Sequence, residues 1–285
     1  MLYFEPNETT LMIRKILATL LLAAAFISAR AASVDTVLVP SAAMHKNVKC
    51  VVIAPAHVKS LRGLHVVYLL NGYSGNHSDY ARHMAPYLRA QADAHHWIFV
   101  CPDGNNSWYW NSPVDSNYRY ETFISTELPA YVDAHYATIA NRTGRAITGL
   151  SMGGHGALWN ALRHPDMFGA VGSMSGGVDV RPFPQNWEVA KRLGPLDTAA
   201  HNWDKWTVME QASSLKNGQL AIIFDCGVRD FFYDVNKALH AKLLAMGIHH
   251  DYIERPGEHN WEYWGNSIQF QLLFFSHYFD NAAAK

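Results

Sequence analysis

The chain has 285 residues, of which 49% are hydrophobic and 16% charged, and its formal net charge is −1 at pH 7. Such a chain can bury a large core, and its length fits one α/β domain better than two small ones. The balanced charge provides no basic face, so nucleic acid is excluded as an expected partner.

The N-terminal 31 residues have the pattern of a signal peptide. Two basic residues precede an apolar run at 16–27, and Ala29 and Ala31 form a small-x-small cleavage site. The run is too short for a permanent membrane span. We therefore expect a secreted or periplasmic protein without a stable membrane anchor. Its mature domain is residues 32–285, and Met1 and Met12 are alternative starts.

Strand and helix patterns alternate along the mature chain. Continuous apolar runs, such as 64–70, are typical of strands buried on both faces. Pro86 and Pro129 predict kinks or breaks in two of the helices. The alternation predicts an α/β fold with a mostly parallel central sheet and helices on both faces. The expected strands are 34–39, 48–53, 64–70, 97–101, 146–150, 168–174, 220–224 and 251–254, and the expected helices are 80–95, 120–136, 152–164, 232–246 and 260–280.

The cysteines and histidines do not form a metal-binding pattern. The three cysteines, Cys50, Cys101 and Cys226, lie in apolar runs, which favours buried free thiols over one disulfide and a leftover thiol. None belongs to a CxxC motif, and the sixteen histidines include no HExxH. We expect no metal and no cofactor.

A serine at a tight turn is the strongest chemical signal. Gly149-Leu150-Ser151-Met152-Gly153 lies between an expected strand and an expected helix, and it matches the G-x-S-x-G nucleophile elbow. The irregular segment 178–218 contains only weak helical stretches, and excursions of this kind often cap a site. We expect it to lie over or beside Ser151.

A serine nucleophile needs a histidine base and an acid that orients the histidine. In this architecture the chain order is serine, acid, histidine, with each partner after a later strand. Asp230 and His259 meet both conditions. Asp225 is the rival acid, nearer to the end of its strand, and Asp234 is a weaker third choice.

The tetrahedral intermediate requires backbone N–H donors. One is expected from Met152, which follows the nucleophile, and the other from the loop 72–75, where Tyr73 is our choice. The aromatic loop 105–118 provides candidates for a substrate wall, since aromatic faces suit sugar rings or aromatic acyl groups. The candidate wall residues are Trp108, Tyr109, Trp110 and, beyond this loop, Trp261.

Several segments together resemble the esterase D-like ("putative esterase") family of α/β-hydrolases. This family contains S-formylglutathione hydrolases, tributyrin, feruloyl and acetyl xylan esterases, and mycolyltransferases. The resemblance implies the same α/β-hydrolase fold and the same roles for Ser151, His259, Asp230, Tyr73 and Met152. The chain departs from the pattern at Asn71, where many members have histidine. The matching segments are Leu69-Leu70-Asn71-Gly72-Tyr73, Pro102-Asp103-Gly104, Ser107-Trp108-Tyr109, Glu121-Thr122-Phe123, Glu127-Leu128, Gly149-Leu150-Ser151-Met152-Gly153-Gly154, Gly227-Val228-Arg229-Asp230 and Pro256-Gly257-Glu258-His259-Asn260-Trp261.

The expected function is that of a secreted serine carboxylesterase. The export signal, the aromatic loop and the resemblance imply short acyl or aromatic acyl esters, including acetyl or feruloyl esters on plant polysaccharide. Three alternative functions are an acyltransferase, an S-formylglutathione hydrolase-like thioesterase, and a catalytically silent carbohydrate-binding member of the family. The sequence does not indicate the oligomeric state.

Overall fold

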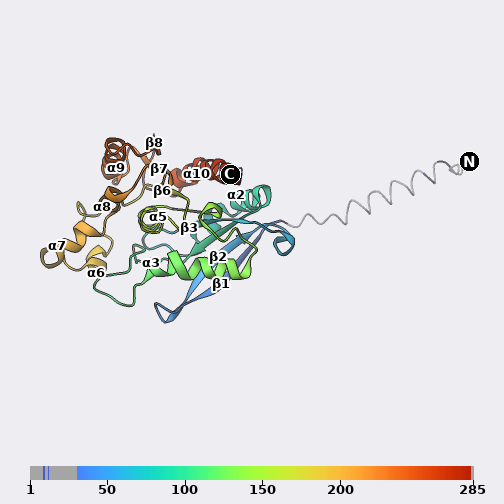
Figure 1. Ribbon diagram of the computed structural model, residues 1–285, viewed down its shortest axis with the longest axis horizontal. Coiled ribbons are helices and arrows are strands. Elements are labelled where there is room, and N and C mark those ends of the chain that lie inside the picture. Colours follow the sequence, from blue (N-terminus) through green and yellow to red (C-terminus); the bar gives the residue numbers. More distant parts are fainter. Residues whose placement is uncertain (1–8, 10–11, 13–30, 284–285) are drawn as a thin grey trace, which may run out of the picture. The chain divides into compact units, whose positions relative to one another are not determined.

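The computed structural model describes residues 9, 12 and 31–283 (Figure 1). The expected signal peptide therefore lies almost entirely outside the described residues. Within this described part of the chain, no helix is long and apolar enough to cross a membrane. The strands and helices from Ala32 onward belong to one compact unit.

Eight strands in the described residues form one sheet in the order β1-β2-β4-β3-β5-β6-β7-β8. β1 pairs antiparallel with β2, and β2 with β4, whereas all remaining pairs are parallel. The expected mostly parallel sheet is confirmed. The strands are β1 Ser33–Ser41, β2 Lys46–Ala54, β3 His65–Leu70, β4 Trp97–Pro102, β5 Arg145–Gly149, β6 Ala170–Met174, β7 Ala221–Gly227 and β8 Asp251–Arg255.

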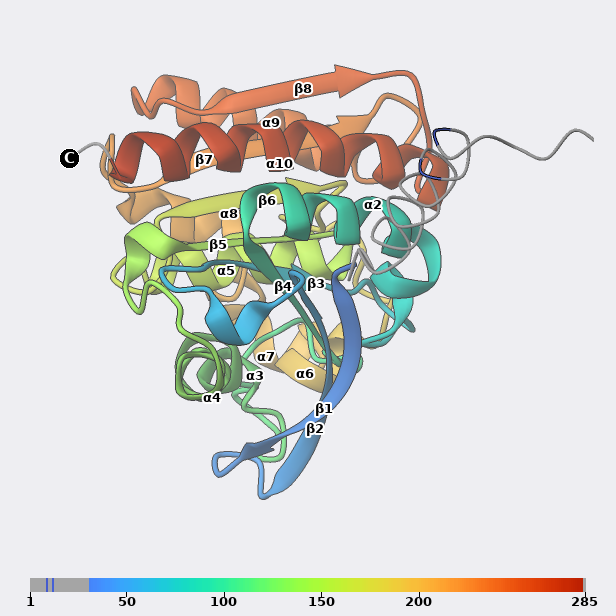
Figure 2. The same ribbon diagram turned by 90° about the vertical axis from the view of Figure 1, so that its right-hand side faces the viewer.

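Helices cover both faces of this sheet, and α2 and α10 lie together on the near side in Figure 2. The helices are α2 Asp79–His95, α3 Tyr120–Thr122, α4 Leu128–His135, α5 Met152–Arg163, α6 Val189–Leu193, α7 Leu196–Lys205, α8 Val208–Gln211, α9 Tyr233–Ala245 and α10 Trp261–Ala283. The short turns are η1 Val58–Ser60, the π-helical η2 Phe123–Glu127, η3 Arg142–Gly144 and η4 Ala212–Ser214.

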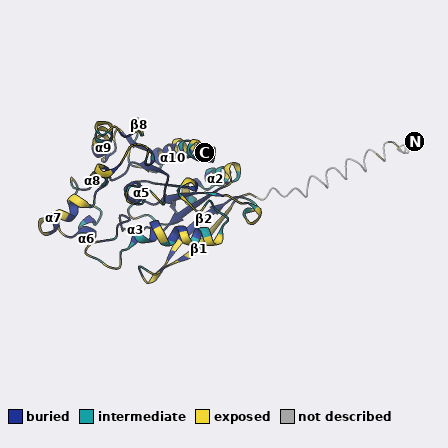
Figure 3. Cartoon of the chain, in the orientation of Figure 1, coloured by how far each residue is buried: buried dark blue, intermediate teal, exposed yellow. Residues whose placement is uncertain are grey.

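Successive side chains of a strand point to opposite faces of the sheet, so the core has two layers. Val67 and Leu69 of β3 pack with α2 and α10, while Val66 and Tyr68 pack on the opposite face with α5. Both sets are buried because helices cover both faces of the sheet (Figure 3). This explains why the central strands are continuous apolar runs without alternating polar residues.

The two prolines have different effects. Helix α2 is continuous through Pro86. Pro129 lies in the first turn of α4, directly after the π-helical turn η2, where the missing N–H needs no helical acceptor. The backbone remains helical at the junctions before and after η2, so the chain is not broken at Pro129 but changes from π-helical to α-helical turns just before it. The three cysteines are buried and free, as predicted, and burial raises the pKa of each thiol.

A buried carboxylate fixes the far end of α5. Glu121 of α3 accepts hydrogen bonds from Trp159 Nε1 at 3.0 Å, Arg163 Nε at 2.8 Å and His164 Nε2 at 2.9 Å. Burial alone raises the pKa of Glu121, but these hydrogen bonds lower it to about 2. The helix that begins beside Ser151 is thus fixed at its other end by a carboxylate that stays ionised.

Candidate active site

Ser151 lies at the sharp turn between β5 and α5, in a strained left-handed conformation with φ 56° and ψ −118°. The turn requires glycine on both sides. A Cβ on Gly149 would lie 2.5 Å from the carbonyl carbon of Gly153, and a Cβ on Gly153 would lie 2.0 Å from the oxygen of Leu70. The glycines therefore allow α5 to approach β3 closely while the turn presents the serine.

The structure brings Ser151, His259 and Asp230 together. His259 Nε2 lies 2.8 Å from Ser151 Oγ, and His259 Nδ1 lies 2.8 Å from Asp230 Oδ2. An ionised carboxylate only accepts hydrogen bonds, so Nδ1 carries the proton and Nε2 is left to accept from the serine hydroxyl. The three residues follow β5, β7 and β8, whose carboxyl ends share one edge of the parallel sheet.

The other two candidate acids lie elsewhere. Asp225 is fully buried and accepts hydrogen bonds from Ser267 and from Gln271 Nε2, the latter at 2.9 Å. Arg255 Nη2 lies 3.4 Å from it. Burial raises the pKa of Asp225, which joins β7 to α10 and β8. Asp234 is exposed in the first turn of α9.

The loop after β3 contacts the nucleophile. A Cβ on Gly72 would lie 3.4 Å from Ser151 Cβ and 2.7 Å from Leu150 Cδ1. Among the hydrogen bonds of residues 31–283, neither the N–H of Tyr73 nor that of Met152 has an acceptor. Two free backbone donors thus flank the serine. The Met152 side chain is buried, and its Sδ accepts from the N–H of Trp108.

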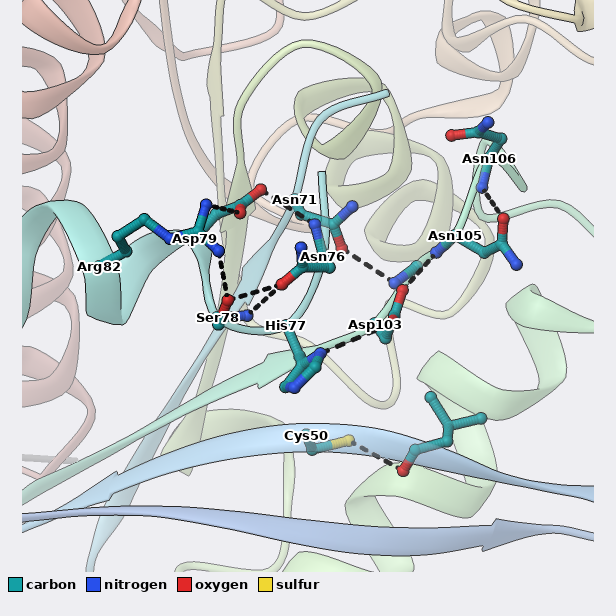
Figure 4. A network of polar contacts seen from close by, with 12 residues as sticks. Cys50, Asn71, Asn76, His77, Ser78, Asp79, Arg82, Asp103, Asn105 and Asn106 are labelled. Atoms are coloured by element: carbon teal, nitrogen blue, oxygen red, sulfur yellow. Dashed lines mark hydrogen bonds and ion pairs between the residues drawn. The ribbon is translucent and has the colours of Figure 1, made fainter. Parts of the chain in front are cut away.

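Polar contacts hold this loop against the loop after β4 (Figure 4). Asn71 Oδ1 accepts from the N–H of Gly104 at 2.9 Å and from the Tyr109 hydroxyl at 3.0 Å. Asn106 Oδ1 accepts from the N–H of Ser74 at 2.9 Å. Asn71, the position at which the chain departs from the family pattern, therefore has a clear structural role: it joins the two loops beside the free donors.

A pocket of about 490 Å³ opens at the serine. Its lining combines aromatic and polar side chains with the glycine-rich loop after β3. One lining residue, Trp187, comes from the irregular segment 178–218, which was expected to lie beside Ser151. The lining residues are Gly72, Tyr73, Ser74, Gly75, Asn76, Asp79, Arg82, His83, Leu150, Ser151, Trp187, Phe231, His259, Trp261 and Trp264.

The expected substrate wall is wrong for three of its four residues. Trp108, Tyr109 and Trp110 are buried and do not line the pocket, whereas Trp261 does. The reason is backbone conformation: Trp108 and Tyr109 have φ values of 56° and 61°, which turn the loop into the interior. There Trp108 and Trp110 pack edge-on against His155 of α5.

His155 of α5 has a structural role. Its Nδ1–H donates to the Trp108 carbonyl at 3.0 Å, and burial lowers the pKa of the imidazole to about 3. It is therefore neutral near pH 7. Glu127 likewise accepts from Ser41 Oγ and from the N–H of Ala43, away from the pocket.

Trp187 and Phe231 line the pocket but were not predicted from the sequence as site residues. Phe231 directly follows Asp230, and its position beside a candidate acid was the available signal. Trp187 carries no local motif, and only the expectation that 178–218 lies near the serine pointed toward it.

The fold and this geometry define a serine hydrolase of the α/β class. Among the described residues, no cluster of three or more His, Cys, Asp or Glu side chains is arranged to hold a metal ion. A profile of the family described as "Putative esterase" matches residues 41–275. The chain belongs to this family, as the resemblance indicated, and is a carboxylic ester hydrolase.

Relatives of known name show the breadth of the family. The diacylglycerol acyltransferase/mycolyltransferase Ag85B of Mycolicibacterium smegmatis is 27% identical, with 83% of this chain and 82% of the relative covered. An acetyl esterase of Caldicellulosiruptor saccharolyticus is also 27% identical, with 72% and 80% covered. A solved ferulic acid esterase has a TM-score of 0.75 and 26% identity, with 87% and 99% covered.

Proposed function

We propose that the enzyme is a serine carboxylesterase in which Ser151 is the nucleophile, His259 the base and Asp230 the orienting acid. His259 Nε2 takes the hydroxyl proton as Ser151 Oγ attacks the ester carbonyl carbon. The bond to the alcohol oxygen then breaks, and the same imidazole gives that oxygen its proton. The observation that carries this proposal is the pair of 2.8 Å contacts on the two nitrogens of His259.

The second half of the cycle uses the same groups. His259 deprotonates a water molecule, which attacks the acyl carbon. The bond between this carbon and Ser151 Oγ then breaks, and the imidazole returns the proton to Oγ, which releases the acid and free Ser151. Asp230 keeps the proton on Nδ1 and stabilises the imidazolium that forms in both halves. The free N–H groups of Tyr73 and Met152 are the proposed donors to the oxyanion.

The proposed substrates are short acyl or aromatic acyl esters, including acetyl or feruloyl esters on plant polysaccharide. Support comes from the similarity to an acetyl esterase and to a ferulic acid esterase, and from the aromatic lining of the pocket. The signal-peptide pattern supports a secreted or periplasmic location, which the N-terminal sequence of the exported protein tests.

The test is a panel of acetyl, butyryl, longer acyl and feruloyl esters together with acetylated xylan. Wild-type protein should hydrolyse at least one class, and Ser151→Ala should abolish turnover. Unchanged turnover in Ser151→Ala contradicts the proposed nucleophile. Absence of turnover in the wild type favours a silent binding protein.

Acyl transfer is the second candidate, favoured by the similarity to a mycolyltransferase over 83% of the chain. Both reactions pass through the same acyl-enzyme, so the rate of transfer to an added alcohol, relative to hydrolysis, decides between them. Transfer that exceeds hydrolysis identifies a transferase.

A further inference from the structure

Two aromatic side chains stand beside the candidate base with no assigned role. The Phe231 ring lies 4.2 Å, centroid to centroid, from the His259 imidazole. The Trp187 ring stacks on Phe231 at 5.3 Å with an interplanar angle of 24°. Both line the pocket at Ser151, and Phe231 is 48% exposed although it is a large apolar residue. Exposed apolar surface inside a pocket is available to a ligand.

Neighbouring side chains and hydrogen bonds fix the position of Trp187. Phe183 and Phe232 pack against Trp187 with centroid distances of 5.3 and 5.0 Å. The Trp187 carbonyl accepts from Trp108 Nε1 at 3.2 Å, so the buried aromatic loop supports the half-buried Trp187. Trp187 and Glu188 both have left-handed φ values, near 50° and 54°, and Asn106 Nδ2 donates to Glu188 at 3.3 Å. A conformation fixed in this way presents a preformed surface.

The position of the pair identifies the part of the ester it meets. In the proposed reaction, His259 Nε2 must give its proton to the leaving alcohol oxygen, which therefore lies within hydrogen-bond distance of Nε2. The carbonyl oxygen points instead toward the N–H groups of Tyr73 and Met152. The group attached to the leaving oxygen consequently lies beside the imidazole, where Phe231 and Trp187 line the pocket.

We propose that Trp187 and Phe231 form the binding wall for the alcohol part of the ester, and that this alcohol carries a ring with an apolar face. An aryl-methyl group and a sugar ring share this chemistry, since both stack on aromatic side chains. The inference rests on the proposed function, and it adds that the ring requirement applies to the alcohol, separately from the acyl group.

The test uses esters with one acyl group and different alcohols: ethyl acetate, benzyl acetate and a monoacetylated methyl xyloside. The sugar hydroxyl is the more acidic alcohol, and comparison with Trp187→Leu separates this effect from binding, since the variant leaves the acidity unchanged. The value of kcat/KM includes only steps up to acylation, which are the steps in which the alcohol is present. Wild-type kcat/KM should be about tenfold or more higher for at least one ring-bearing acetate than for ethyl acetate, as expected for one aromatic contact. The ester with the larger preference shows whether the ring is aryl or sugar.

Trp187→Leu should remove most of this preference, whereas its effect on ethyl acetate should be small by comparison. Phe270→Leu is the matched control, because Phe270 is 43% exposed, like Phe231, but lies on α10 and does not line the pocket. It should keep the preference. Phe231→Leu should also remove the preference. Because Phe231 contacts His259, the informative quantity for this variant is the ratio of kcat/KM between esters.

A second series separates the alcohol from the acyl group. Ethyl acetate, ethyl butyrate and ethyl ferulate share one alcohol, and their relative kcat/KM values should be unchanged in Trp187→Leu. Loss of acyl discrimination with intact alcohol discrimination overturns the inference, as does wild-type hydrolysis without any preference among the alcohols. Both of these results leave the esterase function intact. No hydrolysis by wild-type protein overturns the proposed function and this inference with it.

Discussion

Two histidines near α5 have different surroundings: His259 lies at the pocket, and His155 lies in the core. On the pocket side, His259 lies between a carboxylate and a hydroxyl, each 2.8 Å away. On the buried side, His155 donates to a backbone carbonyl among tryptophans, and its pKa is lowered to about 3. Burial therefore keeps the imidazole of His155 neutral near pH 7, whereas His259 has a polar partner at each ring nitrogen.

The carboxylates repeat this contrast. Asp230 lies next to the pocket and contacts His259, while Asp225, on the same strand end, faces α10. Substitutions on the pocket side should therefore change the reaction rate, and substitutions on the buried side should change stability.

The largest expected effect is at Asp230. Asp230→Asn should lower kcat/KM for a short nitrophenyl ester by about 10³- to 10⁴-fold, because an amide no longer holds the required imidazole tautomer. Its melting temperature should stay close to that of the wild type. If Asp225→Asn alone abolishes turnover of the folded protein, Asp225 is the acid and the contrast between the two sides fails.

The next effect is on acid stability. The pKa of Glu121 is lowered to about 2, so its stabilising contribution is complete above about pH 4.5 and is lost as pH falls through 2. The contribution is about 3 kcal/mol in the free energy of unfolding. Glu121→Gln should therefore lower stability at pH 7 and flatten its pH dependence between pH 4.5 and 2, measured by urea unfolding. Exposed Asp166 provides the control, Asp166→Asn, which should leave the profile unchanged.

A smaller loss of stability is expected at Asp225. Asp225→Asn should lower the free energy of unfolding by about 2 kcal/mol, because the amide no longer matches the buried donors of Ser267 and Arg255. The value of kcat per folded molecule should remain within about twofold. A large fall in kcat at unchanged stability would place Asp225 on the reacting side.

The smallest effect is at Asn106, whose Oδ1 accepts from the N–H of Ser74 beside the proposed oxyanion donor Tyr73. Asn106→Ala should lower kcat about tenfold with little change in KM, because the donor loop loses one hydrogen bond. Asn106→Asp keeps the acceptor oxygen but loses the donor to Glu188, so it should recover the rate only in part. A rise in KM at unchanged kcat would show that Asn106 shapes the pocket alone.

The fold could be predicted from the sequence because strand and helix periods are local properties. The runs at 64–70 and 97–101 correspond to β3 and β4, and the runs at 220–224 and 251–254 to β7 and β8. The placement of Asp230, His259 and Ser151 at one sheet edge followed from parallel strand topology. Helix α7 was not predicted: it is short, it is interrupted by non-helical backbone at Ala199, and its position depends on packing against α6 and α8.

The aromatic lining could not be predicted for a different reason. Composition shows that the loop 105–118 is aromatic, but the direction of each side chain depends on the left-handed backbone at Trp108 and Tyr109. Most non-glycine residues rarely adopt this conformation, so no local pattern predicts it. The same limit applies to Trp187, whose exposure depends on contacts with residues distant in the sequence.

The pairing of β3 with β5 has a consequence for how new specificities can arise. Leu70 is aligned with Gly149, so the strand register itself sets the spacing between the donor loop and the nucleophile. Trp187 and Phe231 lie on connections outside the paired strands. Exchange of these connections between relatives can therefore alter substrate choice while the reacting groups keep their positions, which makes them the natural targets for directed evolution of this enzyme.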